Sequence, residues 1–545
     1  MRVAEAVGRA LAGLGNDTVF GLVGSGNFHV TNALIAGGAR FIAARHEGGA
    51  AVMADAWART TGRVGVLSVH QGPGLTNAMT GITEAAKSRT PLLVLAAEAT
   101  EPRSNFYLDV AGLAAAVGAV HQRVRSPESA VADACHAYQQ AQERRTVLLS
   151  LPLAVQGQQC PPGQVCTGPL IHPPAVSPEG VAALAGLLSG AERPVFIAGR
   201  GARGARRELE GAAGACGALL ATSAAAKGLF QGSPWNLDVS GGFATPLAAE
   251  LIGAADLIVA WGCSLGMWTT RHGTLIGRDA TVVQVDDDPA ALGAHRPVDL
   301  AIVGDVAATA AQLTTAQLTT ALEAGARGYR DPAVRDRIAE AGRWRHVPFT
   351  DESTDRLLDP RTLSIVLDDL LPAERTVAID SGNFMGYPSM FLAVPDEAGF
   401  CFTQAFQSIG LGLASAIGAA VARPDRLTVA ALGDGGALMA VSELETVARL
   451  GIPMVVVVYD DEAYGAEVHH FGPDGDPLDT VRFPPADIAA IGRGFGCDGL
   501  TVRTVDDLKA VREWLAGPRT RPLVVDAKIA SAHGSWWLEE AFRGH

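Results

Sequence analysis

Two acidic turns that follow apolar runs carry the strongest chemical signal in this sequence. The run from Leu427 to Leu432 ends at Gly433-Asp434-Gly435-Gly436, where the backbone can turn tightly and expose N–H groups to an anion. A second run, 454–458, ends at Asp460-Asp461-Glu462, and Asp461 follows Asp434 by 27 residues. Carboxylates are hard oxygen ligands, so the two turns suit a divalent cation that bridges a phosphate.

A helix and a strand between the turns would bring them together. Residues 442–450 have a helical pattern, with Leu444, Val447 and Leu450 apolar, and Gly451-Ile452-Pro453 ends it. Residues 454–458 are typical of a buried parallel strand. Because open α/β sheets bind ligands beyond the carboxyl ends of their strands, both turns are predicted at the ligand-binding edge of one sheet.

The rest of the chain repeats this rhythm of helices and strands. With 545 residues, the chain is longer than a domain with a single hydrophobic core, so about three domains are expected. We predict an α/β protein with three doubly wound parallel-sheet domains, at 1–165, 178–335 and 355–545, joined by linkers at 156–178 and 327–355. The first and third domains look like one architecture used twice. Strands are expected at 18–23, 64–69, 91–96, 146–151, 194–199, 257–261 and 281–285.

Composition excludes several classes of function. With 48% hydrophobic and 18% charged residues, packed domains are expected rather than disorder. The net charge of −14, without a Lys/Arg block, argues against a nucleic-acid partner. No apolar run approaches the roughly 20 residues that cross a bilayer, so no membrane partner is expected. The amphipathic start, Met1–Ala10, lacks a signal-peptide core, which favours a cytoplasmic location.

The cysteines point to the same compartment. There are seven, an odd number, and no two form a Cys-x-x-Cys motif. Such a dispersed set is typical of reduced thiols in a cytoplasmic protein. They stand at positions 135, 160, 166, 216, 263, 401 and 497.

The acidic turns resemble the cofactor motif of thiamine diphosphate (ThDP) enzymes, in the branch of the 2-oxo acid decarboxylases and acetolactate synthases. A lone Gly-Asp-Gly is more often a turn than a cofactor site, but the interval and the terminal Tyr464-Gly465 also fit. The resemblance implies pyrimidine-binding, central and diphosphate-binding domains in that order. It implies Mg²⁺ ligands at Asp434, Asp461 and the carbonyl of Ala463. Implied cofactor contacts here are Gly433, Asp434, Gly435, Gly436, Asp461, Ala463, Tyr464 and Gly465.

Asp461 departs from that pattern, because the family usually has a neutral Asn there. Asp460 and Glu462 add further negative charge on either side. This charge could tighten the metal or repel the diphosphate, depending on the protonation and exposure of the carboxylates. The sequence leaves both alternatives open.

Glu47 opens a helical stretch in Arg45-His46-Glu47-Gly48-Gly49. A first-turn carboxylate is also favoured there by the helix dipole alone. In the resembling enzymes this Glu hydrogen-bonds the aminopyrimidine of thiamine and favours the imino tautomer, whose nitrogen removes the thiazolium C2 proton. That Glu faces the diphosphate domain of another subunit. The resemblance therefore implies a homodimer with shared active sites, and a homotetramer as a dimer of dimers.

Two Gly-rich turns of the first domain offer proton-handling groups. Ser25 follows the predicted strand at 18–23, and His70 follows the strand at 64–69. Either could be only a turn or packing residue. Benzoylformate decarboxylase-like enzymes carry a Ser and a His at these positions, which implies that Ser25 binds a substrate carboxylate and His70 transfers protons. His29 is expected only to pack or cap nearby.

Three further stretches match the family at single positions. Gly382 and Asn383 fall where a strand-end turn binds the diphosphate, and backbone groups of Gln407 and Ile409 fall where the pyrimidine is contacted. Ile409 also matches the aliphatic wedge beneath the cofactor, although alone it would simply be core. Glu467, six residues after Asp461, matches an active-site Glu of the pyruvate decarboxylase branch, whereas acetolactate synthases more often have an apolar residue. The alternative for Glu467 is a solvated helix surface.

These groups imply nonoxidative decarboxylation of a small-molecule 2-oxo acid through a C2 ylid and an enamine, with ThDP and Mg²⁺. Protonation of the enamine gives an aldehyde. Its attack on a second carbonyl gives a hydroxyketone, so carboligase side activity is expected. The alternative is an acetolactate-synthase-like carboligase, followed by a flavin-dependent oxidase or a catalytically silent ThDP-binding protein. FAD is not expected, because Gly262-Cys263-Ser264-Leu265 replaces the Arg-Phe-Asp-Asp of flavin-bearing synthases.

The substrate is less constrained. Trp268, Phe384, Tyr107 and Phe106 could line an apolar pocket, which would suit aromatic or branched 2-oxo acids.

Overall fold

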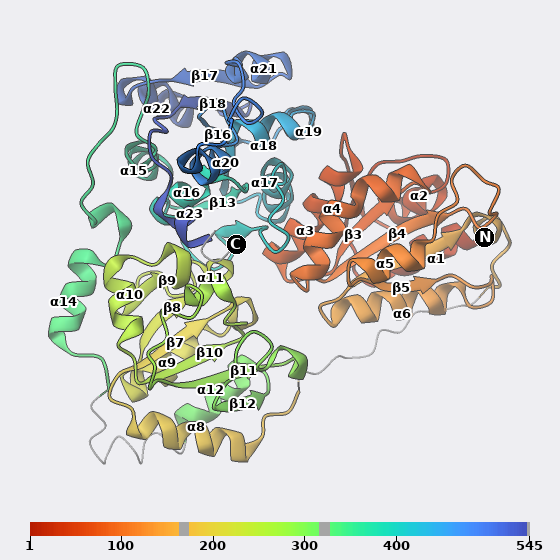
Figure 1. Ribbon diagram of the computed structural model, residues 1–545. Helices are drawn as coiled ribbons and strands as arrows, with labels where there is room; N and C mark the ends of the chain where they lie inside the picture. Colours follow the sequence, from red (N-terminus) through yellow and green to blue (C-terminus); the bar gives the residue numbers. More distant parts are fainter. Residues whose placement is uncertain (163–173, 316–327, 542–545) are drawn as a thin grey trace.

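The computed structural model describes residues 1–162, 174–315 and 328–541. These residues form three α/β units, each built on a six-stranded parallel sheet (Figure 1). The predicted fold class, with three doubly wound sheets, is therefore confirmed. Cys166, the predicted domain end at 165 and the predicted linker start at 327 lie outside the described residues.

The first unit has the strand order β2-β1-β3-β4-β6-β5. Along β4, Leu92 and Val94 pack into one hydrophobic cluster and Leu93 and Leu95 into another, so both faces of the sheet are covered. Its strands are β1 (Thr18–Gly21), β2 (Arg40–Ala43), β3 (Gly65–Val69), β4 (Leu92–Glu98), β5 (Val120–Arg123) and β6 (Thr146–Pro152). Its helices are α1 (Val3–Gly13), α2 (Phe28–Ala36), α3 (Glu47–Thr61), α4 (Pro73–Lys87), α5 (Val110–Ala116), α6 (Ala130–Gln142) and α7 (Leu153–Gln156).

The third unit repeats this arrangement, with the order β14-β13-β15-β16-β18-β17. Counted along the chain, its strands lie in the same order as those of the first unit, so the predicted reuse of one architecture is confirmed. The strands are β13 (Arg375–Ile379), β14 (Phe400–Phe402), β15 (Leu427–Gly433), β16 (Met454–Asp460), β17 (Asp498–Val502) and β18 (Leu523–Lys528). The helices are α15 (Pro360–Leu370), α16 (Gly386–Phe391), α17 (Gly412–Ala422), α18 (Asp434–Met439), α19 (Glu443–Leu450), α20 (Gly465–Phe471), α21 (Ile488–Gly494), α22 (Lys509–Ala516) and α23 (Trp536–Ala541).

The central unit has a different order, β12-β11-β10-β7-β8-β9. Its strands are β7 (Pro194–Ala198), β8 (Leu219–Thr222), β9 (Asn236–Val239), β10 (Leu257–Trp261), β11 (Thr281–Asp286) and β12 (Leu300–Val303). Its helices are α8 (Pro178–Gly190), α9 (Arg206–Cys216), α10 (Pro246–Gly253), α11 (Met267–Thr270) and α12 (Val306–Thr315).

The predicted linker at 327–355 contains a helix, α14 (Pro332–Ala341). The Asp331 side chain caps it by accepting a hydrogen bond from the Val334 N–H, and Pro332 occupies the first turn. Val334 and Ile338, one turn apart, bury themselves against the central unit. The charged composition concealed this helix, because only two apolar side chains anchor it.

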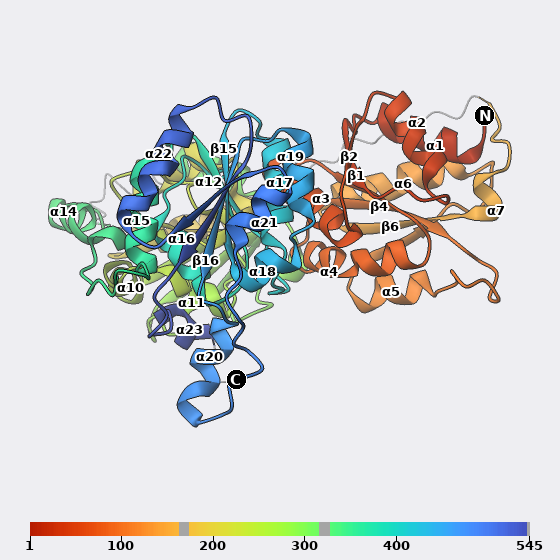
Figure 2. The same cartoon turned by 90° about the horizontal axis from the view of Figure 1, so that it is seen from above.

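Helices α3 and α17 join the first and third units and lie side by side in both views (Figure 1, Figure 2). One hydrophobic cluster includes Ala50 and Met53 of α3 together with Leu413 and Ile417 of α17. A Cβ at Gly418 would clash with the Met53 carbonyl oxygen, so glycine permits this close approach.

A buried charge cluster reinforces the same interface. Arg59 of α3 pairs with Asp55 at 2.8 Å and with Glu84 of α4 at 2.7 Å. Glu84 also accepts hydrogen bonds from the N–H groups of Ala405 and Phe406 in the third unit. All three charged side chains are almost inaccessible to water, so each depends on the others for compensation.

Two observations concern the environment of the chain. Cys135 is disulfide-bonded, so the expectation of reduced thiols throughout is wrong for this residue. Among the described residues Cys160, Cys216, Cys263, Cys401 and Cys497 are free thiols. None of the described helices is both long enough and apolar enough to span a bilayer.

Removing the arginine of the buried cluster should weaken the fold. The change Arg59→Met leaves the Asp55 and Glu84 carboxylates buried without a counter-charge, at a cost of about 3–5 kcal/mol. The midpoint of thermal unfolding, followed by circular dichroism, should fall accordingly. The control Arg207→Met removes an arginine that is 93% exposed, and it should cost less than about 1 kcal/mol. Equal shifts for the two variants would contradict the role given to the cluster.

Candidate active site

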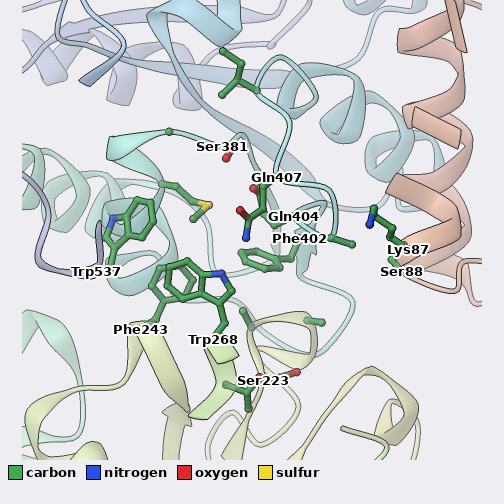
Figure 3. Close-up of a pocket in the computed structure, with 18 of the residues that line it drawn as sticks. Lys87, Ser88, Ser223, Phe243, Trp268, Ser381, Phe402, Gln404, Gln407 and Trp537 are labelled. Carbon is green, nitrogen blue, oxygen red and sulfur yellow. The ribbon is translucent and has the colours of Figure 1, made fainter. Parts of the chain in front are cut away.

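A cavity of about 890 Å³ lies between the central and third units and reaches the first (Figure 3). It opens at the carboxyl ends of β13, β15 and β16, as expected for an open α/β sheet. The structure brings thirteen predicted residues together in its lining: Gly382, Asn383, Gln407, Ile409, Gly433, Asp434, Gly435, Gly436, Asp461, Ala463, Tyr464, Gly465 and Glu467.

Asp434 and Asp461 face this cavity from neighbouring strands. Asp434 is 7% exposed, and burial followed by the charge of Asp460 raises its pKa to about 7. Burial, followed by the charges of Asp434 and Asp460, raises the pKa of Asp461 well above its usual value. Two crowded, buried carboxylates of this kind could hold a cation, because a cation would remove the penalty of ionising both.

Such a cation would need oxygen ligands other than side chains. Within 1–162, 174–315 and 328–541, no group of three or more His, Cys, Asp and Glu side chains could hold a metal ion. Ala463, whose carbonyl was predicted as the third ligand, lies in the cavity lining beside Asp461. Two carboxylates and one carbonyl would leave positions open for ligand oxygens in a six-coordinate Mg²⁺ site.

Three glycines keep this part of the cavity open. A Cβ at Gly435 would come within 2.5 Å of the Tyr464 ring. A Cβ at Gly436 would clash with the carboxylate of Asp380, and a Cβ at Gly465 would clash with that of Asp461. Only glycine allows these groups to approach so closely, which leaves a cradle of the kind that suits a phosphate.

The structure separates the two adjacent aspartates that the sequence left ambiguous. Asp460 and Lys528 are register partners on β16 and β18, and the Lys528 ammonium forms an ion pair with the Asp460 carboxylate. Lys528 also lies 3.2 Å from Asp526, and all three side chains are buried. The charge of Asp460 is thus offset within the protein. Asp461, in contrast, faces the cavity.

Asp380 is a site residue that sequence reasoning missed. Fully buried, it accepts hydrogen bonds from the N–H groups of Ser381, Gly410 and Leu411, at 2.8, 2.9 and 3.2 Å. Burial raises its pKa to about 6. Its carboxylate therefore ties the turn with Gly382 to the loop with Ile409. The only sequence signal was an Asp at a strand end, which is common in turns.

The loop that Asp380 holds is strained. Gln407 has a φ of 58°, in the left-handed region that non-glycine residues rarely adopt. Such strain clusters at ligand sites, where the surrounding structure enforces it. Asn383, on the opposite turn, anchors the C-terminal segment: its Oδ1 accepts from the Ser535 N–H at 3.1 Å, and its carbonyl accepts from the Trp537 indole N–H at 3.2 Å.

Glu47, His70 and Ser25 form a second group, outside this cavity. The Asn77 side-chain amide donates to Glu47 Oε2 at 3.1 Å, and the Gly26 N–H donates to His70 Nδ1 at 3.2 Å. A Cβ on Gly74 would lie 3.0 Å from His70 Cβ and 3.4 Å from Glu47 Oε1. These residues therefore share one edge of the first sheet. Within the described chain, none of the three lines the cavity that holds Asp434.

The predicted aromatic pocket divides between the two groups. Trp268 and Phe384 line the cavity. Phe106 instead packs edge to face on His70, with ring centroids 5.5 Å apart, and Tyr107 is exposed beside it. His29, expected to pack or cap, lies 3.0 Å from Arg2 through its Nε2 and against the ring of Phe28.

Comparison with known proteins agrees with this layout. Residues 1–124 match the N-terminal TPP binding domain of the thiamine pyrophosphate enzymes, residues 181–313 the central domain, and residues 380–527 the C-terminal TPP binding domain. Similar proteins include an acetolactate synthase large subunit of Parasynechococcus marenigrum, 28% identical over 92% of this chain and 83% of the relative.

Two other relatives carry different functions. A protein named "Probable 2-ketoarginine decarboxylase", from Pseudomonas aeruginosa, is 28% identical over 93% of this chain and 91% of its own. A sulfoacetaldehyde acetyltransferase of Castellaniella defragrans is 27% identical over 93% of this chain and 89% of the relative. The family resemblance inferred from the acidic turns is therefore confirmed, and the chain belongs to the thiamine pyrophosphate enzyme family, with the N-terminal, central and C-terminal domains in that order.

Proposed function

We propose that this enzyme is a ThDP- and Mg²⁺-dependent nonoxidative 2-oxo acid decarboxylase with carboligase side activity. When bound, ThDP supplies an electron sink that allows the carboxylate of a 2-oxo acid to leave as CO₂. The observation that best supports decarboxylation over carboligation is the hydrogen bond from the Gly26 N–H to His70 Nδ1.

That hydrogen bond sets the tautomer of His70. A backbone N–H can only donate, so Nδ1 is the acceptor and the neutral ring carries its proton on Nε2. His70 would therefore present its Nε2–H to the substrate as a hydrogen-bond donor. To act as an acid it would first take up a proton at Nδ1, after which loss of the Nε2 proton leaves a neutral ring, and decarboxylation with this protonation would give an aldehyde. Ser25, in the adjacent turn, would hold the substrate carboxylate, and Glu467 would handle protons from the opposite domain.

The residues of the cavity fit the cofactor. Asp434, Asp461 and the Ala463 carbonyl would hold Mg²⁺. The cradle of Gly435, Gly436 and Gly465 would take the diphosphate, with Gly433 and Gly382 beside it. Two buried carboxylates with raised pKa values favour a cation there. Tyr464 and Asn383 would border the diphosphate, while Gln407 and Ile409 would meet the pyrimidine end.

A complete site would need two copies of the chain. Glu47 and His70 share an edge of the first domain, whereas the described lining of the cavity with Asp434 contains neither residue. Exposed apolar side chains lie near both groups: Phe28 and Phe106 in the first domain, and Met439 and Phe406 in the third. We propose that these surfaces meet in a homodimer, within a homotetramer, so that Glu47 of one copy activates ThDP held by the other.

An acetolactate-synthase-like carboligase is the second candidate. The relative from Parasynechococcus marenigrum bears that name. The cavity of about 890 Å³ also has room for a second carbonyl compound.

The function is tested by a screen for CO₂ release. The purified enzyme with ThDP and Mg²⁺ should release CO₂ from at least one aliphatic or aromatic 2-oxo acid, with aldehyde as the main product by chromatography. Hydroxyketone as the main product would instead favour the carboligase. Absence of CO₂ from every 2-oxo acid, despite ThDP binding measured by calorimetry, would indicate a catalytically silent member of the family.

The shared site is tested by complementation between two inactive variants. Glu47→Gln and Asp434→Ala should each nearly abolish CO₂ release, because one removes cofactor activation and the other a metal ligand. Mixed and reassociated, they should recover about a quarter of wild-type activity, because half of the dimers are mixed and one of their two sites is intact. Recovery requires Glu47 and Asp434 of one site to come from different chains. If mixing recovers nothing although mass spectrometry detects mixed dimers, the site is not shared.

The metal site predicts a pH-dependent effect of Mg²⁺ on stability. Burial raises the folded-state pKa of Asp434 to about 7. The folded state then holds a proton that the unfolded state has lost, so the ligand-free protein loses stability as pH rises towards 7. A bound cation offsets this cost. The rise in melting temperature caused by Mg²⁺ should therefore be larger at about pH 8 than at about pH 6.

The variant Asp434→Asn is the control for this measurement, since it removes the ionisable group at nearly constant volume. Mg²⁺ should stabilise this variant only weakly, and any pH dependence that remains would come from Asp461, whose pKa is also raised by burial. A Mg²⁺ effect of the same size in variant and wild type would place the cation elsewhere.

A further inference from the structure

The turn at 461–463 would supply two of the metal ligands, and it is strained. Glu462 stands between Asp461 and Ala463, and its φ of 58° lies in the left-handed region. A glutamate rarely adopts this conformation, which persists only where surrounding contacts enforce it. The contacts of Glu462 therefore fix how the ligands on either side of it are presented to the cavity.

Asp460 makes the first of these contacts. Its Oδ1 accepts a hydrogen bond from the Glu462 N–H at 3.1 Å, which closes a short turn over Asp461. Successive residues of a strand point to opposite faces, and Asp460 is not among the described residues that line the cavity, whereas Asp461 is. Asp460 is only 3% exposed, so its carboxylate needs a partner inside the protein.

Lys528 is that partner, and it also holds the turn from the other side. Its ammonium pairs with Oδ2 of Asp460 and donates a hydrogen bond to the Ala486 carbonyl at 3.1 Å. Ala486 belongs to a segment that contacts the turn, because the Phe483 N–H donates to the Glu462 carbonyl at 2.8 Å. Lys528 therefore fixes both the carboxylate and the chain segment that hold Glu462 in place.

A role for Lys528 as counter-charge alone would have a different consequence. Lys528 is 5% exposed and also lies 3.2 Å from Asp526, so its ammonium offsets negative charge behind the cavity. If charge were its whole contribution, removing the ammonium would strengthen cation binding in the cavity, because the nearby carboxylates would be less neutralised. If Lys528 positions the turn, its removal would weaken cation binding, because Asp460 would lose the partner that keeps it beside Glu462.

We propose that Asp460 and Lys528 form a positioning pair that presents the ligands of the 461–463 turn to a divalent cation. This inference rests on the metal site of the proposed function. Asp460 acts through its hydrogen bond to Glu462, and Lys528 acts by holding Asp460, so neither side chain has to contact the cation. A turn that is ordered in advance binds more tightly, because the cation does not have to order it.

Two double variants that differ in one acceptor oxygen test the role of Asp460. Lys528→Met with Asp460→Asn removes the ion pair but keeps an oxygen that can accept from the Glu462 N–H, whereas Lys528→Met with Asp460→Ala removes this oxygen as well. Both keep the net charge of the wild type. Mn²⁺ favours the same oxygen ligands as Mg²⁺, and electron paramagnetic resonance of unbound Mn²⁺ gives its Kd in the presence of ThDP. The Kd should be about tenfold higher for the alanine variant than for the asparagine variant, and equal values would overturn the role of Asp460.

The single variant Lys528→Met tests the role of the ammonium. It should raise the Kd of Mn²⁺ about tenfold, and adding Asp460→Asn should restore the Kd to within about threefold of the wild type. An unchanged or lower Kd in the single variant would make Lys528 only a counter-charge and overturn its part in the proposal. Circular dichroism checks that each variant is folded. If the single variant does not fold, the comparison of the two double variants decides, since neither leaves an unpaired carboxylate at position 460.

The control Asp434→Ala separates this inference from the proposed function. Removal of a ligand should abolish Mn²⁺ binding at this site, and binding equal to that of the wild type would overturn the metal site and the positioning pair together. If Mn²⁺ binds as expected in every variant but no 2-oxo acid releases CO₂, the proposed decarboxylation fails and the positioning pair stands. If CO₂ is released and the two double variants bind Mn²⁺ equally, the positioning pair fails alone.

Discussion

The candidate site depends on two carboxylates that the fold holds at one buried edge. Strands β15 and β16 pair with Gly433 opposite Tyr459, so the residues that follow, Asp434 and Asp461, emerge side by side into the cavity. Burial makes their joint ionisation unfavourable, as the raised pKa values of both express. This arrangement is costly for the protein alone, and it becomes favourable when a cation enters. The glycine cradle and the loop held by Asp380 lie next to these two carboxylates in the cavity.

The surrounding charges limit that cost. Lys528 takes up the charge of Asp460 on the adjacent strand, so the cavity meets the carboxylate of Asp461 rather than of both neighbours. Asp461, where the resemblance implies a neutral Asn, therefore adds one carboxylate to the cavity lining. Charge compensation also contributes to the contact between the first and third units. There the guanidinium of Arg59 pairs with the carboxylates of Asp55 and Glu84 near the contact of α3 with α17.

The same interface explains why Glu47 lies apart from the cavity with Asp434 within one chain. Packing of α3 on α17 directs the N-terminus of α3 to Glu443 of α19, whose carboxylate accepts from the N–H groups of Arg45 and His46. Glu47 is thereby oriented beside Asn77 and His70, outside the cavity of its own chain. The first and third units share one strand order, as expected if each presents an equivalent edge. Pairing such edges between copies would bring the groups together.

The sequence by itself determined the class of fold and the positions of the two acidic turns. The two turns follow apolar runs and end in Gly-Asp-Gly and Asp-Asp, and the spacing between them holds one helix and one strand. These are local sequence patterns, so they can be recognised without knowledge of the tertiary structure. The helix at 332–341 was not predicted, because it lies in a charged segment and only two of its apolar side chains are buried. Two such residues do not form a recognisable helical pattern of apolar positions. The tie formed by Asp380 and the pairing of Lys528 with Asp460 were decided only by tertiary structure. Each depends on which groups meet across long sequence separations, and hydrogen bonds, ion pairs and burial exist only once those groups are in contact.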